Sequence, residues 1–223
     1  MTMAYSGQSP KGADIRNRIL DVAEEMFAGR SFSSVSVRDI TGEAGVNLAA
    51  VNYYFGSKVA LFKAVFLRRA SQLNRERRDR LNQVLGASGD GAPALDAVLR
   101  ALLEPPVRWM FDPDRGLNVF VQFLARCQME EEPELRALFN EDVEHLRRFI
   151  PPLKQAVPDL PEEDICWCLH FALGAMHQTF THLTRLQSIS SNLCDISDPD
   201  LIVDRMIEFA RGGFEAACAR GRA

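Results

Sequence analysis

The sequence predicts an all-α protein with a small N-terminal domain and a larger C-terminal one. Apolar residues recur at spacings of three and four through most of the 223 residues, which is the helical period. No stretch alternates convincingly between apolar and polar residues with the period of two that strands show. The prolines are predicted to fall between helices, at 105–106, 113, 133, 151–152, 158, 161 and 199. Together these observations indicate a helical fold.

The composition is that of an ordinary globular protein, with 47% hydrophobic and 25% charged residues. No apolar run reaches the roughly 18 to 20 residues of a membrane span, and the N-terminus lacks the charged-then-apolar order of a signal peptide. We therefore expect a cytoplasmic protein with no membrane partner. The five cysteines show no paired framework, so reduced thiols are expected.

The charge is unevenly distributed along the chain. Residues 11–80 contain 13 Lys or Arg against 8 Asp or Glu, a balance of +5, so a total of -4 leaves -9 for the remainder. A basic N-terminal segment followed by an acidic remainder suits a protein that binds a polyanion through its N-terminal part only. A chance asymmetry of the surface is the alternative.

The first elements follow from local signals. Residues 1–12 are small, polar and turn-prone, and are predicted to form a disordered arm. A helix is predicted from Asp14 to Ala28, with Asp14 as its N-cap. After a break at 29–34, the sequence SVRD fits a capping box, in which the Ser36 hydroxyl and the Asp39 carboxylate each bind a backbone N–H of the other residue. A second helix follows.

The next segment predicts a helix-turn-helix. Gly45 can take the left-handed conformation that ends a helix, and Asn47 can cap the next one. That helix is predicted at Leu48–Phe55, with Val51 and Phe55 facing inward at i and i+4. The residues left for its other faces are Leu48, Ala49, Ala50, Asn52, Tyr53 and Tyr54.

These outward residues suit a helix that enters a DNA groove. Short side chains let the backbone approach the bases, while donors and aromatic rings reach phosphates, thymine methyls and groove walls. Arg38, near the start of the second helix, can reach a guanine edge or a phosphate, and Lys58 lies in the first turn of the fourth helix. The alternative is an ordinary surface on a three-helix bundle, although Tyr53 and Tyr54, adjacent on so short a helix, cannot both be core residues.

The rest of the chain divides into a connector and a larger domain. The N-terminal DNA-binding domain is predicted at 13–58, the connecting helix at 59–85, and the C-terminal domain at 86–223. The connector begins apolar and becomes basic from Arg75 to Arg80, and the glycine-rich stretch 86–93 is predicted to be a loop. Later helices are predicted at 95–103, 107–111, 117–129, 134–150, 165–188 and 201–219.

The N-terminal segment resembles the DNA-binding domain of the TetR/AcrR family of bacterial transcriptional regulators over about residues 14–67. The strings ILDVAEEMF, SVRDI, AGVNLAAVNYYF and GSK carry the resemblance. It implies base or groove contacts by Arg38, Leu48, Ala49, Asn52 and Tyr53, and phosphate contacts by Ser36, Tyr54 and Lys58. Three positions depart from the family pattern: Ser31 replaces a usual glycine, Tyr54 a frequent histidine, and Ala50 lacks the hydroxyl that many members use on a phosphate.

The resemblance also implies a variable helical ligand domain. Aromatic residues mixed with isolated polar ones suit an elongated apolar cavity for a lipophilic ligand, although such stripes are more often plain core. The predicted ligand-binding residues are Trp109, Phe120, Phe123, Arg126, Phe149, Trp167, His170, Phe171, His177 and Gln178. The strings AVNYYFGSK and HFALGAM are similar to the fatty-acid-responsive branch, so a fatty acid or acyl-CoA is the expected effector.

A homodimer is implied as well, since the last two long helices of the family pair with those of a second subunit. The residues predicted at this interface are Leu173, Phe180, Met206, Phe209, Gly213 and Phe214. Two DNA-binding domains about one DNA turn (~34 Å) or more apart can read a pseudo-palindrome. The sequence thus predicts a repressor that binds a double-stranded DNA operator and responds to a small-molecule effector.

An enzyme and a protein-interaction module are the alternatives to a repressor. An enzyme would need a site without a recognisable motif, because the chain has no G-x-S-x-G, P-loop, dinucleotide fingerprint or H-E-x-x-H. A protein-interaction module, or within the family a multidrug-responsive repressor, stays open. No cofactor and no metal are expected: Cys166 and His170 share a helix face, but His170 and His177 lie two turns apart, about 10 Å, too far for one ion without other ligands.

Overall fold

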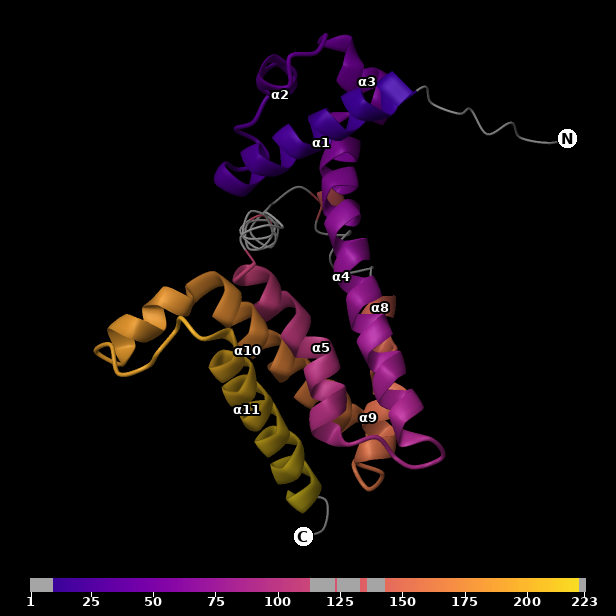
Figure 1. Cartoon of the computed structure of the whole chain (residues 1–223), viewed down its shortest axis with the longest axis vertical. Helices are drawn as coiled ribbons and strands as arrows, with labels where there is room; N and C mark the ends of the chain where they lie inside the picture. Colours follow the sequence, from indigo (N-terminus) through magenta and orange to yellow (C-terminus); the bar gives the residue numbers. More distant parts are fainter. Residues whose placement is uncertain (1–9, 113–122, 124–132, 136–142, 221–223) are drawn as a thin grey trace, which may run out of the picture. The chain divides into compact units, whose positions relative to one another are not determined.

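The computed structural model describes residues 10–112, 123, 133–135 and 143–220. Within these ranges every regular element is a helix, which confirms the all-α prediction (Figure 1). The helices are α1 (Pro10–Gly29), α2 (Val37–Glu43), α3 (Ala49–Phe55), α4 (Lys58–Ser88), α5 (Leu95–Met110), α8 (Glu144–Arg147), α9 (Ile150–Ala156), α10 (Glu162–Ile189) and α11 (Pro199–Arg220).

The chain divides into two compact units. Unit 1 contains Met1–Arg69 and Gln122–Leu138, and unit 2 contains Ala70–Val121 and Phe139–Ala223. The division falls inside α4, after Arg69, so this helix belongs to both units. The predicted domain bounds follow helix ends, whereas this division follows which residues pack together.

Unit 1 is a small helical domain around an aromatic core. Helix α1 packs on α2, and α2 on α3. Phe27 and Phe62 are almost completely buried, with ring centroids 4.9 Å apart, and Phe123 lies 4.9 Å from Phe62. Ile40 of α2 and Val51 of α3 are fully buried. Each of the two short helices is therefore fixed to this core by its inner face.

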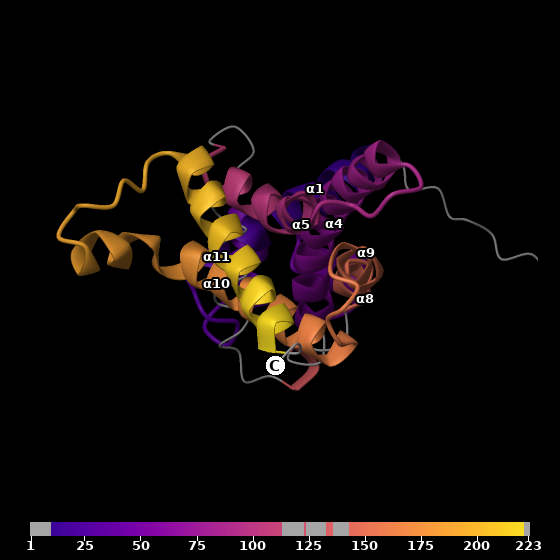
Figure 2. The same cartoon turned by 90° about the horizontal axis from the view of Figure 1, so that it is seen from below.

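Unit 2 is built from α5, α8, α9, α10, α11 and the part of α4 from Ala70 onward. Helix α11 packs along both α5 and α10, and α9 contacts α5 and α10 (Figures 1 and 2). The largest fully buried side chains here include Leu99, Leu102, Phe149 and Phe214. The apolar faces predicted for these helices therefore meet in one core.

Several helix boundaries differ from the prediction. Helix α4 runs to Ser88, so residues 86–88 of the predicted loop are helical. Helix α1 begins at Pro10, so Asp14 is not its N-cap, and residues 10–12 of the predicted arm are helical; residues 1–9 lie outside the described part. Proline suits a first turn, whose N–H groups have no helical acceptor. For the same reason Pro151 and Pro152 lie in the first turn of α9, a helix that the sequence reading missed.

Helix α5 runs through Pro105 and Pro106, where a break was predicted. Pro106 has no N–H to donate to the carbonyl of Leu102, four residues earlier. The Arg77 Nε–H from α4 donates to that oxygen instead, at 2.9 Å. A tertiary contact thus satisfies the carbonyl that the proline leaves free, and the prediction of two separate helices was wrong.

The predicted helix 117–129 lies outside the described residues, except for Phe123. Of the predicted helix 134–150, the structure describes a helical stretch at 133–135 and then α8. Helices α10 and α11 match their predictions within three residues at each end. Within α10, His182 has non-helical angles (φ -139°, ψ 29°), which marks a kink.

Candidate functional site

The start of α2 is fixed by the predicted capping box. The Asp39 N–H donates to Ser36 Oγ at 3.1 Å, and the Ser36 N–H donates to Asp39 Oδ2 at 3.0 Å. The pKa of the Asp39 carboxyl is lowered, first by the bond from the Ser36 backbone and then by its side chain. The first turn that carries Arg38 is therefore held in one conformation.

The turn between α2 and α3 has the geometry that the sequence predicted. Gly45 has φ +60°, in the left-handed region. Its N–H donates to the Gly42 carbonyl at 3.1 Å, and the Val46 N–H donates to the Thr41 carbonyl at 3.0 Å, the two bonds of a Schellman motif. Asn47 Oδ1 then accepts the Ala49 N–H at 2.9 Å and caps α3.

Helix α3 presents one buried face and one exposed face. Val51 is fully buried, and Arg16 lies over the Phe55 ring at 5.2 Å from its centroid. On the opposite side Tyr53 is 81% exposed, and its ring meets that of Tyr54 edge-on with centroids 4.9 Å apart. Leu48, Ala49 and Asn52 are also exposed. The residues of α3 that were predicted to contact bases or the groove thus share a solvent-facing surface.

Two donors on this surface are unengaged. Arg38 and Asn52 are exposed, and within the described ranges neither side chain has a hydrogen-bond or ion-pair partner. A guanidinium and a carboxamide are the groups that most often make bidentate contacts with guanine and adenine in the major groove. The α2–α3 surface therefore offers free donors beside short side chains, as a groove-reading helix requires.

The three predicted phosphate contacts are differently placed. Ser36 is exposed, and its hydroxyl, which already accepts the cap bond, can still donate. Tyr54 is half-buried. The Lys58 ammonium donates to the Phe32 carbonyl and lies 4.1 Å from the centroid of the Phe32 ring, so it holds the loop that follows α1. A phosphate contact by Lys58 stays a prediction.

A buried ion cluster, which sequence reasoning missed, joins α1 to α4 within unit 1. Glu24 is buried and binds Arg68, and it also accepts from Arg69 Nε at 2.8 Å. Arg68 binds the exposed Asp21 as well, at 2.7 Å. Only the apolar neighbours of Glu24 at helical spacing could have signalled that this carboxylate faces inward.

The residues predicted to bind a ligand do not gather around one site. Phe120 and Arg126 lie outside the described residues. Phe123 is fully buried in unit 1 against Phe27 and Phe62, so it belongs to the core of the DNA-binding unit. The other predicted residues are in unit 2.

Within unit 2 the remaining predicted residues take different positions. Trp109 and Phe149 are buried in its core. Trp167 and Phe171 of α10 are 54% and 61% exposed, with stacked rings 5.8 Å apart, and His170 beside them is exposed. These aromatic residues were predicted to line a ligand cavity, but in the protomer they face solvent. The remaining two predicted residues are His177, which is half-buried, and Gln178, which is exposed.

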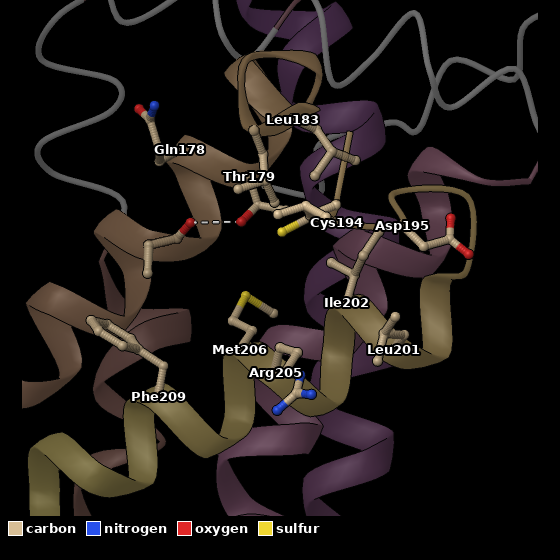
Figure 3. Close-up of a pocket in the computed structure, with 13 residues that line it drawn as sticks. Gln178, Thr179, Leu183, Cys194, Asp195, Leu201, Ile202, Arg205, Met206 and Phe209 are labelled. Atoms are coloured by element: carbon tan, nitrogen blue, oxygen red, sulfur yellow. Dashed lines mark hydrogen bonds between the residues drawn. The ribbon is translucent and has the colours of Figure 1, made fainter. Parts of the chain in front are cut away.

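A pocket of about 610 Å³ lies between α10, α11 and the loop that joins them (Figure 3). Its walls are mostly aliphatic, and polar groups come from Gln178, Thr179, Asp195 and Arg205. Phe209 lies at one end of it and is 67% exposed. A second hollow of about 610 Å³, between α10 and α11, also contains Phe209 together with Trp167 and Phe171. The outer side of the α10–α11 pair is therefore hollowed and apolar.

The predicted dimer residues separate into inner and outer sets. Met206 and Phe214 are buried in the core of their own protomer. Leu173 is partly buried against the same core, and the side chain of Phe180 lies outside the described part. Phe209 and Gly213 are exposed. On a helix of period 3.6, spacings of three and four do not distinguish an internal seam from an external one.

The environment of His177 predicts that the free energy of unfolding depends on pH. Burial lowers the pKa of its imidazole, and His182 lowers it further. The unfolded state therefore binds a proton more readily, so the free energy of unfolding should fall as the pH decreases from about 6.5 towards the lower folded-state pKa. Measured by urea unfolding across this pH range, the free energy of unfolding should fall less in His177→Gln than in the wild type. The matched control His170→Gln changes an exposed histidine, and an equal effect of both substitutions would contradict the assignment.

In the described ranges, no helix is long and apolar enough to cross a membrane. The same residues contain no group of three or more His, Cys, Asp or Glu side chains that could hold a metal ion.

Family models match both parts of the chain. Residues 19–65 match the model of bacterial regulatory proteins of the tetR family. Residues 100–213, just over half of the chain, match the tetracyclin repressor-like C-terminal domain. No curated protein gives a significant match.

Solved structures show the same fold at low sequence identity. A transcriptional regulator from Pseudomonas aeruginosa PAO1 has a TM-score of 0.66 at 16% identity, over 96% of each chain. FadR from Bacillus subtilis, solved with stearoyl-CoA, has a TM-score of 0.65 at 16% identity, over 88% of this chain and 98% of that one. NalD of Pseudomonas aeruginosa, a secondary repressor of the MexAB-OprM multidrug efflux pump, has a TM-score of 0.60 at 20% identity, over 91% and 97%.

Proposed function

Because the chain belongs to the TetR family of bacterial transcriptional regulators, we propose that it is a ligand-responsive repressor that binds a pseudo-palindromic operator as a homodimer. Effector bound in the C-terminal domain favours a spacing of the two DNA-binding units that does not fit the operator, and transcription resumes. Such a shift requires the effector to bind one spacing more tightly than the other.

The exposed α2–α3 surface is the observation that carries DNA binding. Arg38, Asn52 and Tyr53 point away from the unit 1 core, while Val51 and Ile40 fix the two helices to it. A rigid element with short exposed residues and free donors suits the major groove. The capping box and the Schellman turn hold these donors in place before DNA arrives, which lowers the entropy lost on binding.

A salt titration tests this function. The wild-type protein should bind operator-sized DNA from around its own gene far more tightly than random DNA, with an affinity that falls steeply as the salt concentration rises. Gel-shift or fluorescence-anisotropy titrations at several salt concentrations measure both quantities. Equal affinity for operator-region and random DNA would overturn the repressor function and favour a protein-interaction module.

The α10–α11 surface supports the homodimer. It carries the exposed aromatics Trp167, Phe171 and Phe209 on hollowed, largely apolar walls, and exposed patches of this kind mark interaction sites. Aromatic residues are also frequent hot spots of interfaces. A two-fold interface presents each of these residues twice.

Replacing Phe209 with Arg should therefore dissociate the dimer. Burying a charge in place of an aromatic anchor is expected to raise the dimer dissociation constant at least ~30-fold, the equivalent of a hot-spot loss of about 2 kcal/mol. Sedimentation velocity over a concentration series measures it. The control Leu67→Arg places the same charge on an exposed apolar residue of unit 1. Unchanged self-association of Phe209→Arg would exclude this surface.

A lipophilic effector, a fatty acid or acyl-CoA, is the proposed ligand class. The apolar core of unit 2 and the resemblance to the fatty-acid-responsive branch support it. A multidrug-type effector is the alternative within the family. Mass spectrometry of small molecules extracted from the purified protein distinguishes lipids from other compounds, and the recovery of polar metabolites alone would contradict a lipophilic effector.

A further inference from the structure

Arg77 is a charged side chain inside the core of unit 2. It lies on α4, is 5% exposed, and is surrounded by the apolar residues of α5 and α10. Its Nε–H donates to the Leu102 carbonyl, and its Nη2 lies 3.5 Å from the Met176 sulfur. A guanidinium has five N–H donors, and these two acceptors are neutral.

No carboxylate of the described residues lies within ion-pair distance of Arg77, and the charge of Glu76, the preceding residue, acts on the guanidinium only at longer range. Glu76, the neighbouring acid, instead accepts from Trp109 Nε1 at 2.8 Å and from Arg80 at 3.1 Å. Burial lowers the pKa of Arg77 to about 10, so the group is still protonated at neutral pH. A buried charge without an ion-pair partner is costly, and an anion bound in direct contact with Arg77 would offset that cost.

The Leu102 bond explains only part of this arrangement. A neutral donor would satisfy the carbonyl that Pro106 leaves free, so that role does not require a positive charge. The second contact is a thioether, which is a weak acceptor on a flexible, unbranched side chain. A carboxylate oxygen in place of the Met176 sulfur would form a charge-assisted bond about twice as strong as a neutral one.

A second buried polar group lies on α10, at His177, the residue after Met176. The Nε2 atom of His177 is buried and has no hydrogen-bond partner among the described residues. Its imidazole is kept neutral by burial, so Nε2 can carry a hydrogen to donate or present a lone pair. Unit 2 therefore holds two polar groups, on α4 and α10, whose bonding capacity the described protein does not use.

We propose that Arg77 is the anchor for an anionic group of the effector, and that the effector is an apolar organic acid whose carboxylate displaces the Met176 side chain from the guanidinium. This inference rests on the proposed function and adds a charge requirement to it. Arg77 lies on α4, which continues into unit 1, and Met176 lies on α10. A carboxylate bound to Arg77 therefore replaces the Arg77–Met176 contact between these two helices. That change supplies the differential contact that a ligand-driven switch requires.

Decanoate and 1-decanol, which differ at the head group, test the charge requirement in the full chain. The chain has two tryptophans, so Trp167→Phe leaves Trp109, buried and bonded to the neighbour of Arg77, as the only indole reporter. In this background decanoate should bind ~10- to 100-fold more tightly than decanol, as expected for a bond to a charged group. Equal affinity for the two probes would overturn the proposal.

Arg77→Gln keeps a donor for the Leu102 carbonyl and removes the charge. It should lower decanoate affinity to that of decanol and leave decanol binding unchanged. Arg77→Lys, which keeps the charge, should retain a preference for the acid. Arg80→Gln is the matched control, because it removes one charge from the same helix at a partly exposed position paired with Glu76 and Glu104. An acid preference that survives in Arg77→Gln would overturn the assignment.

The result is separable from the proposed function. Should Arg77→Gln fail to fold, as judged by its thermal unfolding, the comparison of the two probes on the Trp167→Phe protein and on Arg77→Lys still decides the matter. Absence of binding by both probes, with specific operator binding intact, overturns the anion anchor and leaves the repressor standing. Loss of specific DNA binding by the wild type would instead refute the repressor.

Discussion

Arg38→Ala is expected to weaken operator binding by about 1–3 kcal/mol for each DNA-binding unit, the value of a bidentate base contact. Because a homodimer carries the substitution twice, the total loss should be about 2–6 kcal/mol, or roughly 30-fold to more than 10⁴-fold in affinity. The physical reason is that the Arg38 guanidinium is exposed, has no partner within the described part of the chain, and lies in the helix turn that the Ser36–Asp39 capping box holds in place. Fluorescence anisotropy with labelled operator measures the change.

The same titration separates the two contacts open to Arg38. A base contact predicts relaxed sequence preference with little change in salt dependence, whereas a phosphate contact predicts equal weakening on all sequences and a salt slope reduced by about 1 per unit. Arg78→Ala is the charge-matched control, since Arg78 is partly exposed on the unit 2 part of α4 and paired with Asp79. Equal effects of the two substitutions would show that only total charge matters.

Glu24→Ala is expected to destabilise unit 1 by about 3 kcal/mol, towards the lower end for a broken buried ion pair, since both arginines retain some contact with solvent. The substitution leaves Arg68 and Arg69 facing a site from which their shared carboxylate is gone, and it also leaves a small cavity between α1 and α4. Hydrogen exchange of α1 amides, together with urea unfolding followed by circular dichroism, measures the loss in the unit concerned.

Asp21→Asn is the control for Glu24→Ala. Asp21 binds the same Arg68 from an exposed position, so its neutralisation should cost less than about 1 kcal/mol. The contrast between two carboxylates on one arginine isolates the effect of burial. Similar effects of both substitutions would show that the cluster acts as an ordinary surface network.

The helix-turn-helix was predictable because its signals are local. The bonds of Ser36 with Asp39, the positive φ of Gly45 and the cap at Asn47 each involve residues a few positions apart, and each was predicted at the position where it occurs. The same holds for the inward Val51 and the outward Tyr53, because period and length leave an eight-residue helix only one way to bury its apolar face.

The ligand domain was less predictable, because its decisive contacts join distant residues. In the sequence Arg77 is one member of a basic run on a connector; in the structure it is buried and bonded to the carbonyl that Pro106 leaves free on another helix. The aromatic side of α10 was read as a ligand wall, yet in the protomer Trp167 and Phe171 are exposed. Apolar residues on all sides of a helix predict that each side is buried, but they do not identify the surface that buries it.

The sequence by itself determined the all-α class, the caps and turn of the DNA-reading element, and the outward set on α3, since short-range hydrogen bonds and helical period decide these. Tertiary structure alone decided that α5 continues through two prolines, that Glu24 and Arg77 are buried, and which side of α11 faces the core. Each of these depends on a partner from a distant part of the chain that supplies a donor, a countercharge or a packing surface, and no local pattern identifies that partner.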